Sequence, residues 1–377
     1  MTTGKLRVEE LEINRRFEAT FWKNPNAGSK YPLRATHLDG RRAPKVVLAN
    51  DARIIAGVPC MVKVTAVHKP ERADHGHIEV EYIGPAPFKI KGVYLDPIVS
   101  KKLQVALQSG LNILLDGPQG CGKTVLARSI AESLGMEFIF FNCGAVVEAT
   151  DFFATIQVRA SDSGSPVTDF IKTDILIALE MAQENPDTRF LVFLDELNRC
   201  AETARNGLMP ALDSTRKVFH PIENRFIPIP DNVQFIAAVN RGRAFSGTFG
   251  IDAAQLDRFA PLQMDYLPPA EEVKLLIARH PDVAKASIEH LVAVADRIRN
   301  SPDLVASLSV RATDEACIFL EHELFQGDPK VQIPEVMKTS FCGRFSGRWN
   351  DVGSDAGAVW VLVTNTLRER GIKVKTD

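Results

Sequence analysis

The chain has 377 residues, of which 45% are hydrophobic and 24% charged, and its formal net charge is −2 at pH 7. At roughly one domain per 100–200 residues, this length predicts two or three domains, and the composition is that of a soluble globular protein. The near-neutral total excludes binding to nucleic acid through bulk charge. The charge is uneven, because residues 1–92 hold 16 Lys and Arg against 10 Asp and Glu and the remainder carries −8.

The cysteines are dispersed along the chain and form no paired motif. They are Cys60, Cys121, Cys143, Cys200, Cys317 and Cys342. Their spacing indicates neither a disulfide framework nor a zinc site, and it is typical of thiols in a reducing compartment. The first residues contain no apolar signal region, and no apolar run approaches the ~20 residues of a membrane span. We therefore predict a cytoplasmic protein without a membrane partner.

Residues 1–92 are predicted to form a small β-domain. Short alternating runs, separated by turn-rich breaks near residues 24–28 and 73–76, are typical of strands in a barrel or sandwich, and an OB-like barrel is one candidate. The predicted strands are Phe17–Phe21, Leu33–His37, Lys45–Leu48, Met61–Val67 and His77–Ile83. The Gly-Pro-Ala-Pro stretch at 84–87 reads as a linker.

From residue 93 onward, apolar strands alternate with helices, which predicts an α/β domain with a parallel sheet over residues 93–267. Its predicted strands are residues 113–115, 137–141, 190–194 and 235–239, and its predicted helices are residues 125–134 and 175–182. Residues 268–325 are mainly helical in pattern (271–279, 288–298 and 313–324) and are expected to form an appended helical domain. Residues 326–377 are expected to form a C-terminal extension, with one helix over 358–368.

Residues 117–124, Gly-Pro-Gln-Gly-Cys-Gly-Lys-Thr, fit the phosphate-binding pattern G-x-x-x-x-G-K-[ST], with a buried strand before and a helix after. Glycines let backbone N–H groups surround phosphate oxygens at a helix N-terminus. Lys123 is expected to reach the β- and γ-phosphates, and the Thr124 hydroxyl to ligate Mg²⁺. The expected nucleotide-binding residues are Pro118, Gly120, Cys121, Gly122, Lys123, Thr124 and Val125, together with Asp195.

Two further apolar strands end in polar side chains. Residues 190–194 precede Asp195 and Glu196, which are expected to hold Mg²⁺ and to polarise the attacking water. Residues 235–239 precede Asn240, whose amide can hydrogen-bond that water or the γ-phosphate. An ordinary turn is the alternative for each, since polar residues are common at strand ends. The phosphate-binding loop earlier in the chain favours the catalytic interpretation.

The order of these motifs resembles that of AAA+ ATPases over roughly residues 95–325. Within that class the chain is most similar to the MoxR group of the helix-2-insert clade. Leu194–Arg199 (L-D-E-L-N-R) is close to that group's L-D-E-I-N-R, and Gln255–Phe259 matches its Q-L-D-R-F. Ser309–Ala312 (S-V-R-A) lies on the predicted helical domain, which the resemblance makes a lid.

The resemblance implies a role for several residues. Asn240 falls on sensor 1, and Arg311 falls on sensor 2, the lid arginine that touches the γ-phosphate. Arg258 falls on the arginine finger that reaches the neighbouring subunit's nucleotide, and Arg199 matches an arginine often found at the subunit boundary. A surface ion pair is the alternative for each arginine.

Two segments fit elements that the clade uses to line a pore or to remodel a substrate. Residues 148–173 are long enough for the helix-2 insert, and residues 216–229 read as a β-hairpin. The chain also departs from the family. Asn240 is followed by Arg241-Gly242-Arg243 rather than Pro, and neither residues 1–92 nor the tail at 341–349 belongs to the common core.

The resemblance implies a magnesium-dependent ATPase that assembles as a homo-oligomeric ring, expected to be hexameric, and remodels a protein in the manner of a chaperone. The implied partner is a protein substrate or adaptor, for example one carrying a von Willebrand A domain. A nucleic-acid motor that uses the basic residues 1–92 is the first alternative. A nucleotide-gated scaffold with little hydrolysis is the second, and Glu196, Asn240 and Arg258 argue against it.

Overall fold

The computed structural model describes residues 6, 11–24, 30–39, 41–43, 47–54, 57–68, 77–86, 90, 92–160, 166–240, 250–304, 306–325, 327–372 and 374. The chain forms two compact units. The first comprises residues 1–115, 124–239 and 247–262, and the second comprises residues 116–123, 240–246 and 263–377. The predicted breaks at 25–28 and 73–76, and residues Arg241 to Arg243, lie outside the described residues.

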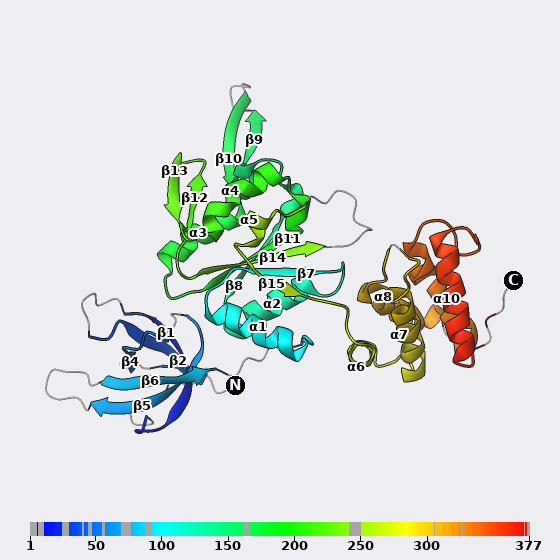
Figure 1. The fold of residues 1–377 in the computed structure, drawn as a ribbon, viewed down its shortest axis with the longest axis horizontal. Coiled ribbons are helices and arrows are strands. Elements are labelled where there is room, and N and C mark those ends of the chain that lie inside the picture. Colours follow the sequence, from blue (N-terminus) through cyan, green and yellow to red (C-terminus); the bar gives the residue numbers. More distant parts are fainter. Residues whose placement is uncertain are drawn as a thin grey trace. The chain divides into compact units, whose positions relative to one another are not determined.

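The N-terminal strands close on themselves as a barrel (Figure 1). They are β1 (Arg16–Lys23), β2 (Leu33–Leu38), β3 (Arg41–Arg42), β4 (Val47–Ala49), β5 (Cys60–His68) and β6 (His77–Pro85). The sheet order is β1-β5-β6-β4-β2-β3, and β1 also pairs with β2, which closes the sheet. The β4–β6 pair is parallel, whereas β1 pairs antiparallel with both neighbours. The strands predicted to begin at residues 17, 33, 45, 61 and 77 each overlap an observed strand, and residues 45 and 46 of the third lie outside the described residues.

The barrel interior is filled because the strands alternate in and out. Phe17, Phe21, Val62 and Ile78 are each at most 1% exposed and belong to one apolar core. Their neighbours along the strands face outward, as the period of two requires. The alternation that predicted strands therefore also sets which side chains form this core.

A second sheet is parallel and lies at the centre of the first unit. Its strands are β7 (Ile113–Gly117), β8 (Glu137–Asn142), β11 (Phe190–Asp195), β14 (Val233–Asn240) and β15 (Ala260–Gln263), in the order β15-β7-β14-β11-β8. Both β8 and β14 pair parallel with β11. Every residue of β14 is buried, as expected for a strand covered on both faces. The predicted parallel sheet is confirmed.

Helices cover both faces of this sheet, with α1 and α2 on one side and α3 and α4 on the other (Figure 1). Their bounds are Pro97–Gln108, Lys123–Leu134, Asp174–Glu184 and Glu202–Leu212, and a short α5 spans Ala253–Leu256. The Asp96 carboxylate accepts from the amides of Ile98 and Val99 and so caps α1. Gly135, at φ +62°, follows the last residue of α2 as the pattern predicted. Sequence periodicity missed α1 and α4.

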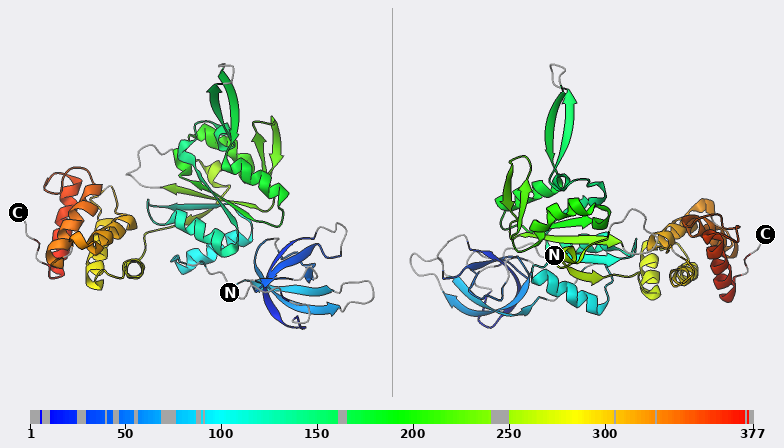
Figure 2. Two further views of the ribbon diagram at one scale, coloured as in Figure 1. Left: turned by 180° about the vertical axis from the view of Figure 1, so that it is seen from behind. Right: turned by 45° about the horizontal axis from the view of Figure 1, so that its top comes forward.

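Two β-hairpins project from the first unit beside α3 and α4 (Figure 2). The longer one joins β9 (Ala154–Ala160) to β10 (Pro166–Lys172), and the shorter one joins β12 (Lys217–His220) to β13 (Arg225–Pro228). The shorter hairpin is the one that the sequence predicted at residues 216–229. The longer hairpin occupies the predicted insert at residues 148–173.

The second unit contains five helices among the described residues. They are α6 (Pro269–Arg279), α7 (Lys285–Arg299), α8 (Val310–Glu321), α9 (Pro329–Ser340) and α10 (Asp355–Glu369). One apolar core runs from Leu276 to Ile372 and draws on all five helices. The segments that we predict separately as a lid and an extension therefore share a core. The helix predicted over 313–324 ends at Glu321, and Leu324 lies in a short 3₁₀ turn.

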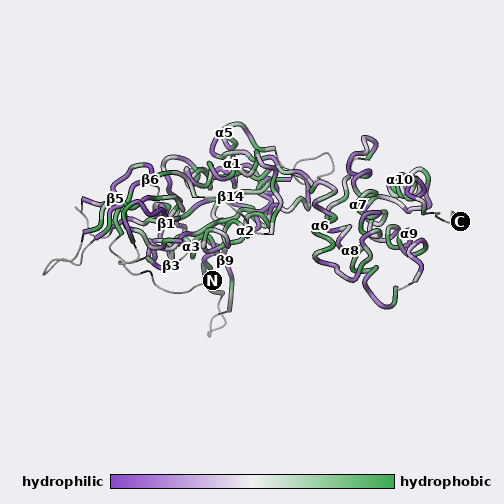
Figure 3. Tube along the Cα trace, turned by 90° about the horizontal axis from the view of Figure 1, so that it is seen from below, coloured by the Kyte–Doolittle hydropathy of each residue, from purple (hydrophilic) through white to green (hydrophobic). Residues whose placement is uncertain are grey.

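Hydrophobic and hydrophilic residues are mixed along each of these helices, and none of them is hydrophobic throughout (Figure 3). Among the helices that the structure describes, none combines the length and the apolarity that crossing a membrane requires. The six cysteines are buried as thiols. Burial raises the pKa of the Cys60, Cys317 and Cys342 thiols to about 12.

A buried ion pair fixes three of the helices in the second unit. The Glu272 carboxylate, which is fully buried, lies 2.5 Å and 3.1 Å from the two terminal nitrogens of Arg299. Thr313 Oγ1 donates to the same carboxylate over 2.6 Å. A bidentate pair with a further hydrogen bond satisfies both charges, so α6, α7 and α8 are held in one register.

Candidate nucleotide-binding site

Polar side chains gather where the parallel strands end. Because β8, β11 and β14 run in the same direction, their carboxyl ends lie along one edge of the sheet, where α/β proteins bind ligands. Asn142 ends β8 directly opposite Asp195, which ends β11. Asn240 ends β14 and is buried. The predicted phosphate-binding loop follows β7, the other neighbour of β14 in the sheet.

The phosphate-binding loop has the backbone that its glycines allow. Gly120 and Gly122 have φ values of +74° and +95°, in the region that favours glycine. Lys123 begins α2, and its buried ammonium group donates to the carbonyl oxygens of Gly117 (2.9 Å) and Pro118 (2.8 Å). The loop thus curls around the lysine at the N-terminus of a helix, which is the geometry that attracts phosphate.

Thr124 and Asp195 are brought together across 71 residues of sequence. Thr124 Oγ1 donates to Asp195 Oδ2 over 3.2 Å. Hydroxyl and carboxylate oxygens are ligands that Mg²⁺ prefers, and it usually keeps several of its waters beside one or two protein oxygens. The two residues predicted as metal ligands therefore form a donor set that fits Mg²⁺.

Glu196 is held in an unusual backbone conformation. Its φ of +53° and ψ of +41° place it in the left-handed region, which non-glycine residues rarely adopt. Its amide donates to Asp195 Oδ1 over 3.0 Å, and its Oε2 lies 3.1 Å from Nε of Arg199. Strain of this kind clusters at functional sites. The side chain is 25% exposed, so the carboxylate remains accessible to solvent.

Asn142 is a candidate residue that the sequence interpretation missed. Its Oδ1 accepts from the amide of Gly144 over 2.9 Å. A Cβ built on Gly144 would lie 3.1 Å from that oxygen and 3.7 Å from Glu196 Oε2, so the three residues form one cluster. The signal was available, because Asn142 follows an apolar strand just as Asn240 does.

The remaining loop residues differ in their surroundings. Cys121 is buried, and burial raises the pKa of its thiol although Lys123 opposes the shift. Its side chain is therefore a neutral packing group. Val125 lies in the first turn of α2 and is 52% exposed. Any contribution of Val125 to nucleotide binding would therefore come from an exposed side chain.

Residues of the helical region contact the phosphate-binding loop within the second unit. Tyr266 Oη donates to the carbonyl of Gln119 over 3.2 Å. The Arg299 guanidinium lies 4.8 Å from the centre of the Tyr266 ring, a cation–π distance. Arg311, predicted as sensor 2, is exposed in the first turn of α8. It lies two residues after Ser309, which packs directly against Gly120.

We expect Gly120→Ala to weaken ATP binding by at least about tenfold, because the loop must move to accept a Cβ. That atom would lie 2.5 Å from Ser309 Cβ, at a φ of +74°. Titration with a fluorescent ATP analogue measures the change. Gly110→Ala is the matched control, because its φ of +65° carries the same strain while its Cβ meets no atom within 4 Å. Equal effects of the two changes would contradict a role for the Ser309 contact.

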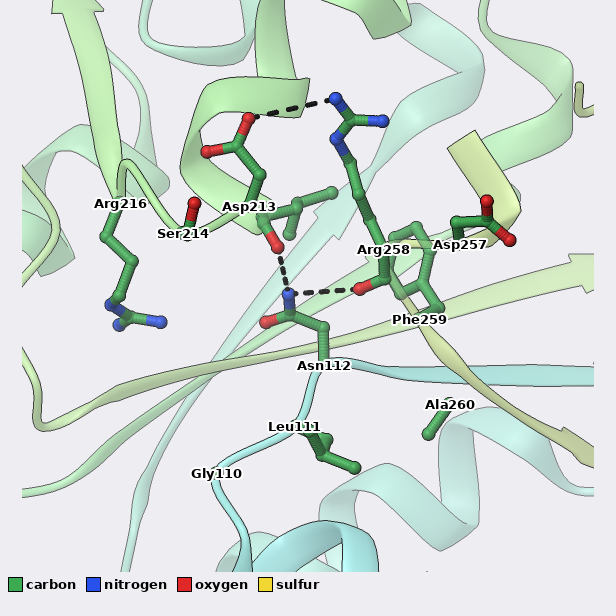
Figure 4. A pocket seen from close by; sticks show the side chains of 11 residues that line it. Gly110, Leu111, Asn112, Asp213, Ser214, Arg216, Asp257, Arg258, Phe259 and Ala260 are labelled. Atoms are coloured by element: carbon green, nitrogen blue, oxygen red, sulfur yellow. Dashed lines mark hydrogen bonds and ion pairs between the residues drawn. The ribbon is translucent and has the colours of Figure 1, made fainter. Parts of the chain in front are cut away.

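Arg258 lies at the opposite end of β7 from the phosphate-binding loop. Asn112, which precedes β7, donates to the carbonyls of Leu212 (2.7 Å) and Arg258 (3.3 Å), and Figure 4 shows the bond to Arg258. The Arg258 side chain is 29% exposed, and its Nη2 lies 3.7 Å from Asp213 Oδ2. Both residues line a cavity of about 570 Å³. The structure therefore does not bring Arg258 to the nucleotide loop of its own chain.

A buried arginine positions the segment that carries Arg258. Arg205, on α4, is fully buried, and its Nε donates to Gln255 Oε1 over 3.1 Å. It also donates to the carbonyls of Cys200 (3.0 Å) and Gly250 (2.6 Å). Gln255, the first residue of the Q-L-D-R-F motif, thus anchors α5 to α4. The sequence offered no signal for Arg205, since an arginine within a helix is usually exposed.

Comparison with known proteins bears directly on this region. Residues 112–259 match the family model of the AAA domain, dynein-related subfamily. The match runs from the residue before β7 to the end of the Q-L-D-R-F motif. This stretch is therefore similar to AAA domains. The AAA domain is a P-loop nucleoside-triphosphatase domain, which agrees with the loop and with the acidic strand end described above.

Curated relatives match about half of the chain. The chain is 27% identical over 172 residues to an uncharacterized protein of Staphylococcus saprophyticus, covering 46% of this chain and 62% of that protein. It is 27% identical over 231 residues to "Putative chaperone BssE" of Thauera aromatica, covering 57% and 71%. A third relative, uncharacterized and from Staphylococcus haemolyticus, is 26% identical over 180 residues, covering 47% and 65%. The matches to both Staphylococcus proteins span less than two thirds of those proteins.

Proposed function

We propose that this chain is a MoxR-type AAA+ ATPase that assembles into a hexameric ring and uses ATP hydrolysis to remodel a protein partner in the cytoplasm. One observation carries the ATPase part of the proposal. Thr124, from the phosphate-binding loop, and Asp195, from the acidic strand end, lie within hydrogen-bonding distance beside the strained Glu196. Chance turns would not bring these three residue types together at the carboxyl edge of a parallel sheet.

Each residue of the site has a proposed task in phosphoryl transfer to water. Lys123 binds the β- and γ-phosphates, and Glu196 takes a proton from the attacking water. Asn240 orients that water, and Arg311 contacts the γ-phosphate from α8. Mg²⁺ bound near Thr124 and Asp195 would neutralise charge on the phosphate oxygens. Arg258 stabilises the transition state at the neighbouring subunit, because it lies at the far end of β7 from its own loop.

The ion pair between Glu196 and Arg199 suggests a resting state. Nε of Arg199 lies 3.1 Å from Glu196 Oε2, so one oxygen of the proposed base is engaged by the guanidinium. Release of Arg199 during assembly would free that oxygen to face the attacking water. Arg199 is 40% exposed, so a neighbouring subunit could engage it.

Exposed apolar side chains on the projecting hairpins support a protein substrate. On the longer hairpin Ile156 and Phe170 face each other across the strands and are 64% and 49% exposed. On the shorter hairpin Phe219 and Phe226 pack edge to face, with 38% and 56% exposed. Apolar groups displayed in this way mark protein interaction sites. The chaperone name of the Thauera aromatica relative agrees, and a protein with a von Willebrand A domain is the partner class we propose.

A nucleic-acid motor is the second candidate, because of the barrel. Its pairing order, with β1 between β2 and β5 and a parallel β4–β6 pair, supports an OB-type barrel. Barrels of that type bind oligonucleotides and oligosaccharides. The net charge of +6 over residues 1–92 is modest for such a role. Stimulation of the ATPase by single-stranded DNA that falls steeply between two salt concentrations would favour this candidate.

Capture of the substrate tests the main proposal. The Glu196→Gln variant should retain its partner in ATP and release it in ADP, and the retained partner should be a protein that survives nuclease treatment. Adding Phe170→Ser should abolish the retention, because the hairpin loses a large part of its apolar contact area. Val352→Ser is the matched control, since Val352 is 93% exposed and lies outside both hairpins. Retention of nucleic acid instead of protein would contradict protein remodelling.

A further inference from the structure

Two histidines and a glutamate meet on the barrel, outside the AAA domain. His68 is the last residue of β5 and His77 the first residue of β6, and the two are direct partners across the strands. Glu79 lies two residues after His77, so it shares the same face of the sheet. One ligand atom from each of the three residues lies within 4.8 Å of the others.

Their side chains converge on a single point. His68 Nε2 lies 2.9 Å from Glu79 Oε1, and His77 Nε2 lies 3.7 Å from the same oxygen. The two imidazole rings are stacked, with centroids 4.2 Å apart and planes inclined by 15°. Both Nε2 atoms therefore face the same carboxylate oxygen. The side chains are 47%, 25% and 28% exposed, so a solvated ion can reach them.

Tyr31 contacts two residues of the cluster. Its hydroxyl donates to Glu79 Oε1, and its ring lies 5.4 Å from that of His77, centroid to centroid. A hydrogen bond to a ligating carboxylate and packing against a ligating ring are the contacts that fix metal ligands in place. The barrel therefore supplies both the three donors and a residue that orients two of them.

We propose that His68, His77 and Glu79 bind a divalent transition-metal ion, Zn²⁺ or a close relative such as Co²⁺. Two imidazole nitrogens and one carboxylate oxygen are a donor set that these ions accept, with a fourth position left for water or another ligand. Mg²⁺ and Ca²⁺ prefer oxygen ligands, so the site discriminates against the magnesium of the ATPase site. The ion would join the end of β5 to the start of β6.

Among the described residues, the cysteines and a second histidine cluster are less suited to bind such an ion. The six cysteine thiols are buried, and burial holds them in the neutral form, which binds metal weakly. A second cluster comprises Glu180, His220 and Glu223. There the His220 ring is only 2% exposed, and its Nδ1 accepts from the amide of Glu223. Nε2 then carries the proton and faces Glu180, so this histidine is committed to hydrogen bonds.

Equilibrium dialysis of the tag-free full chain against Co²⁺ or Zn²⁺ alone tests the proposal, with the visible spectrum of Co²⁺ as a second readout. We expect one ion per chain. His68→Ala, His77→Ala and Glu79→Gln should each weaken binding at least about 100-fold, and Tyr31→Phe about 10-fold, because it removes the hydrogen bond to Glu79. His37→Ala is the matched control, since His37 is an exposed barrel histidine outside the cluster.

The metal-binding test does not require every variant to be stable. Circular dichroism and basal ATPase activity report folding, and His68→Gln and His77→Gln replace any alanine variant that unfolds. A loss of Co²⁺ binding in folded variants, with binding intact in His37→Ala, supports the site. The same affinity as the wild type in a folded variant that combines His68→Ala, His77→Ala and Glu79→Gln, or no stoichiometric binding to the wild type, would overturn it.

Discussion

Replacing Glu196 by glutamine should lower the rate of ATP hydrolysis at least about 100-fold, the scale on which a general base contributes to catalysis. ATP binding should persist, because the change leaves Lys123 and the loop amides, the proposed phosphate contacts, in place. The amide is nearly isosteric with the carboxylate, so the left-handed backbone at this position is retained. A steady-state phosphate-release assay gives the rate, and titration with labelled ATP gives the affinity.

Glu184→Gln is the matched control for this measurement. Glu184 is an exposed carboxylate at the end of α3, and its change removes the same charge away from the site. Its hydrolysis rate should stay within about twofold of the wild type, as expected for a surface substitution. A Glu196→Gln enzyme that hydrolyses ATP at the wild-type rate would rule out Glu196 as the base.

The second large effect concerns Arg258. Alone, Arg258→Ala should lose about 10³-fold or more in turnover, the lower end of the range for an arginine finger. Lys123→Ala should be inactive because it loses a phosphate contact. In an equal mixture, about a quarter of the interfaces in a head-to-tail ring would combine an intact Lys123 with an intact Arg258 from the neighbour. Activity should therefore partly return, since the two changes affect opposite sides of each interface.

This complementation tests whether Arg258 acts at a distance from the phosphate-binding loop of its own chain. The backbone of Arg258 is tied to Asn112 at the start of β7, whereas the phosphate-binding loop follows its end. At about 3.3 Å per residue, the five residues of β7 separate the two by roughly 16 Å. Arg279→Ala, which removes an exposed arginine of α6 paired with Asp314, should have no such effect. A failure to recover activity in rings shown by differential tagging to be mixed would contradict action in trans.

Local patterns predicted a large part of this protein from sequence alone. The phosphate-binding loop lies within eight consecutive residues, so its chemistry needs no distant partner. The strands ending at Asp195 and Asn240 were predicted because buried parallel strands are continuous apolar runs. The barrel strands were predicted because alternation is itself a consequence of a half-buried strand. In each case the physical cause acts over a few residues, which a pattern can record.

Only the tertiary structure decided which distant residues meet. Arg205 and Gln255 are 50 residues apart, and Tyr266 and Gln119 are 147 apart, and neither pair has a sequence pattern that predicts the contact. The meeting of His68 with Glu79 depends on the β5–β6 register, since a slip of one residue would turn one strand's side chains to the other face. Propensity and periodicity contain no term for register or for the order of strands. These are set by the packing of the whole core, which places Arg258 at one end of β7 and the phosphate-binding loop at the other.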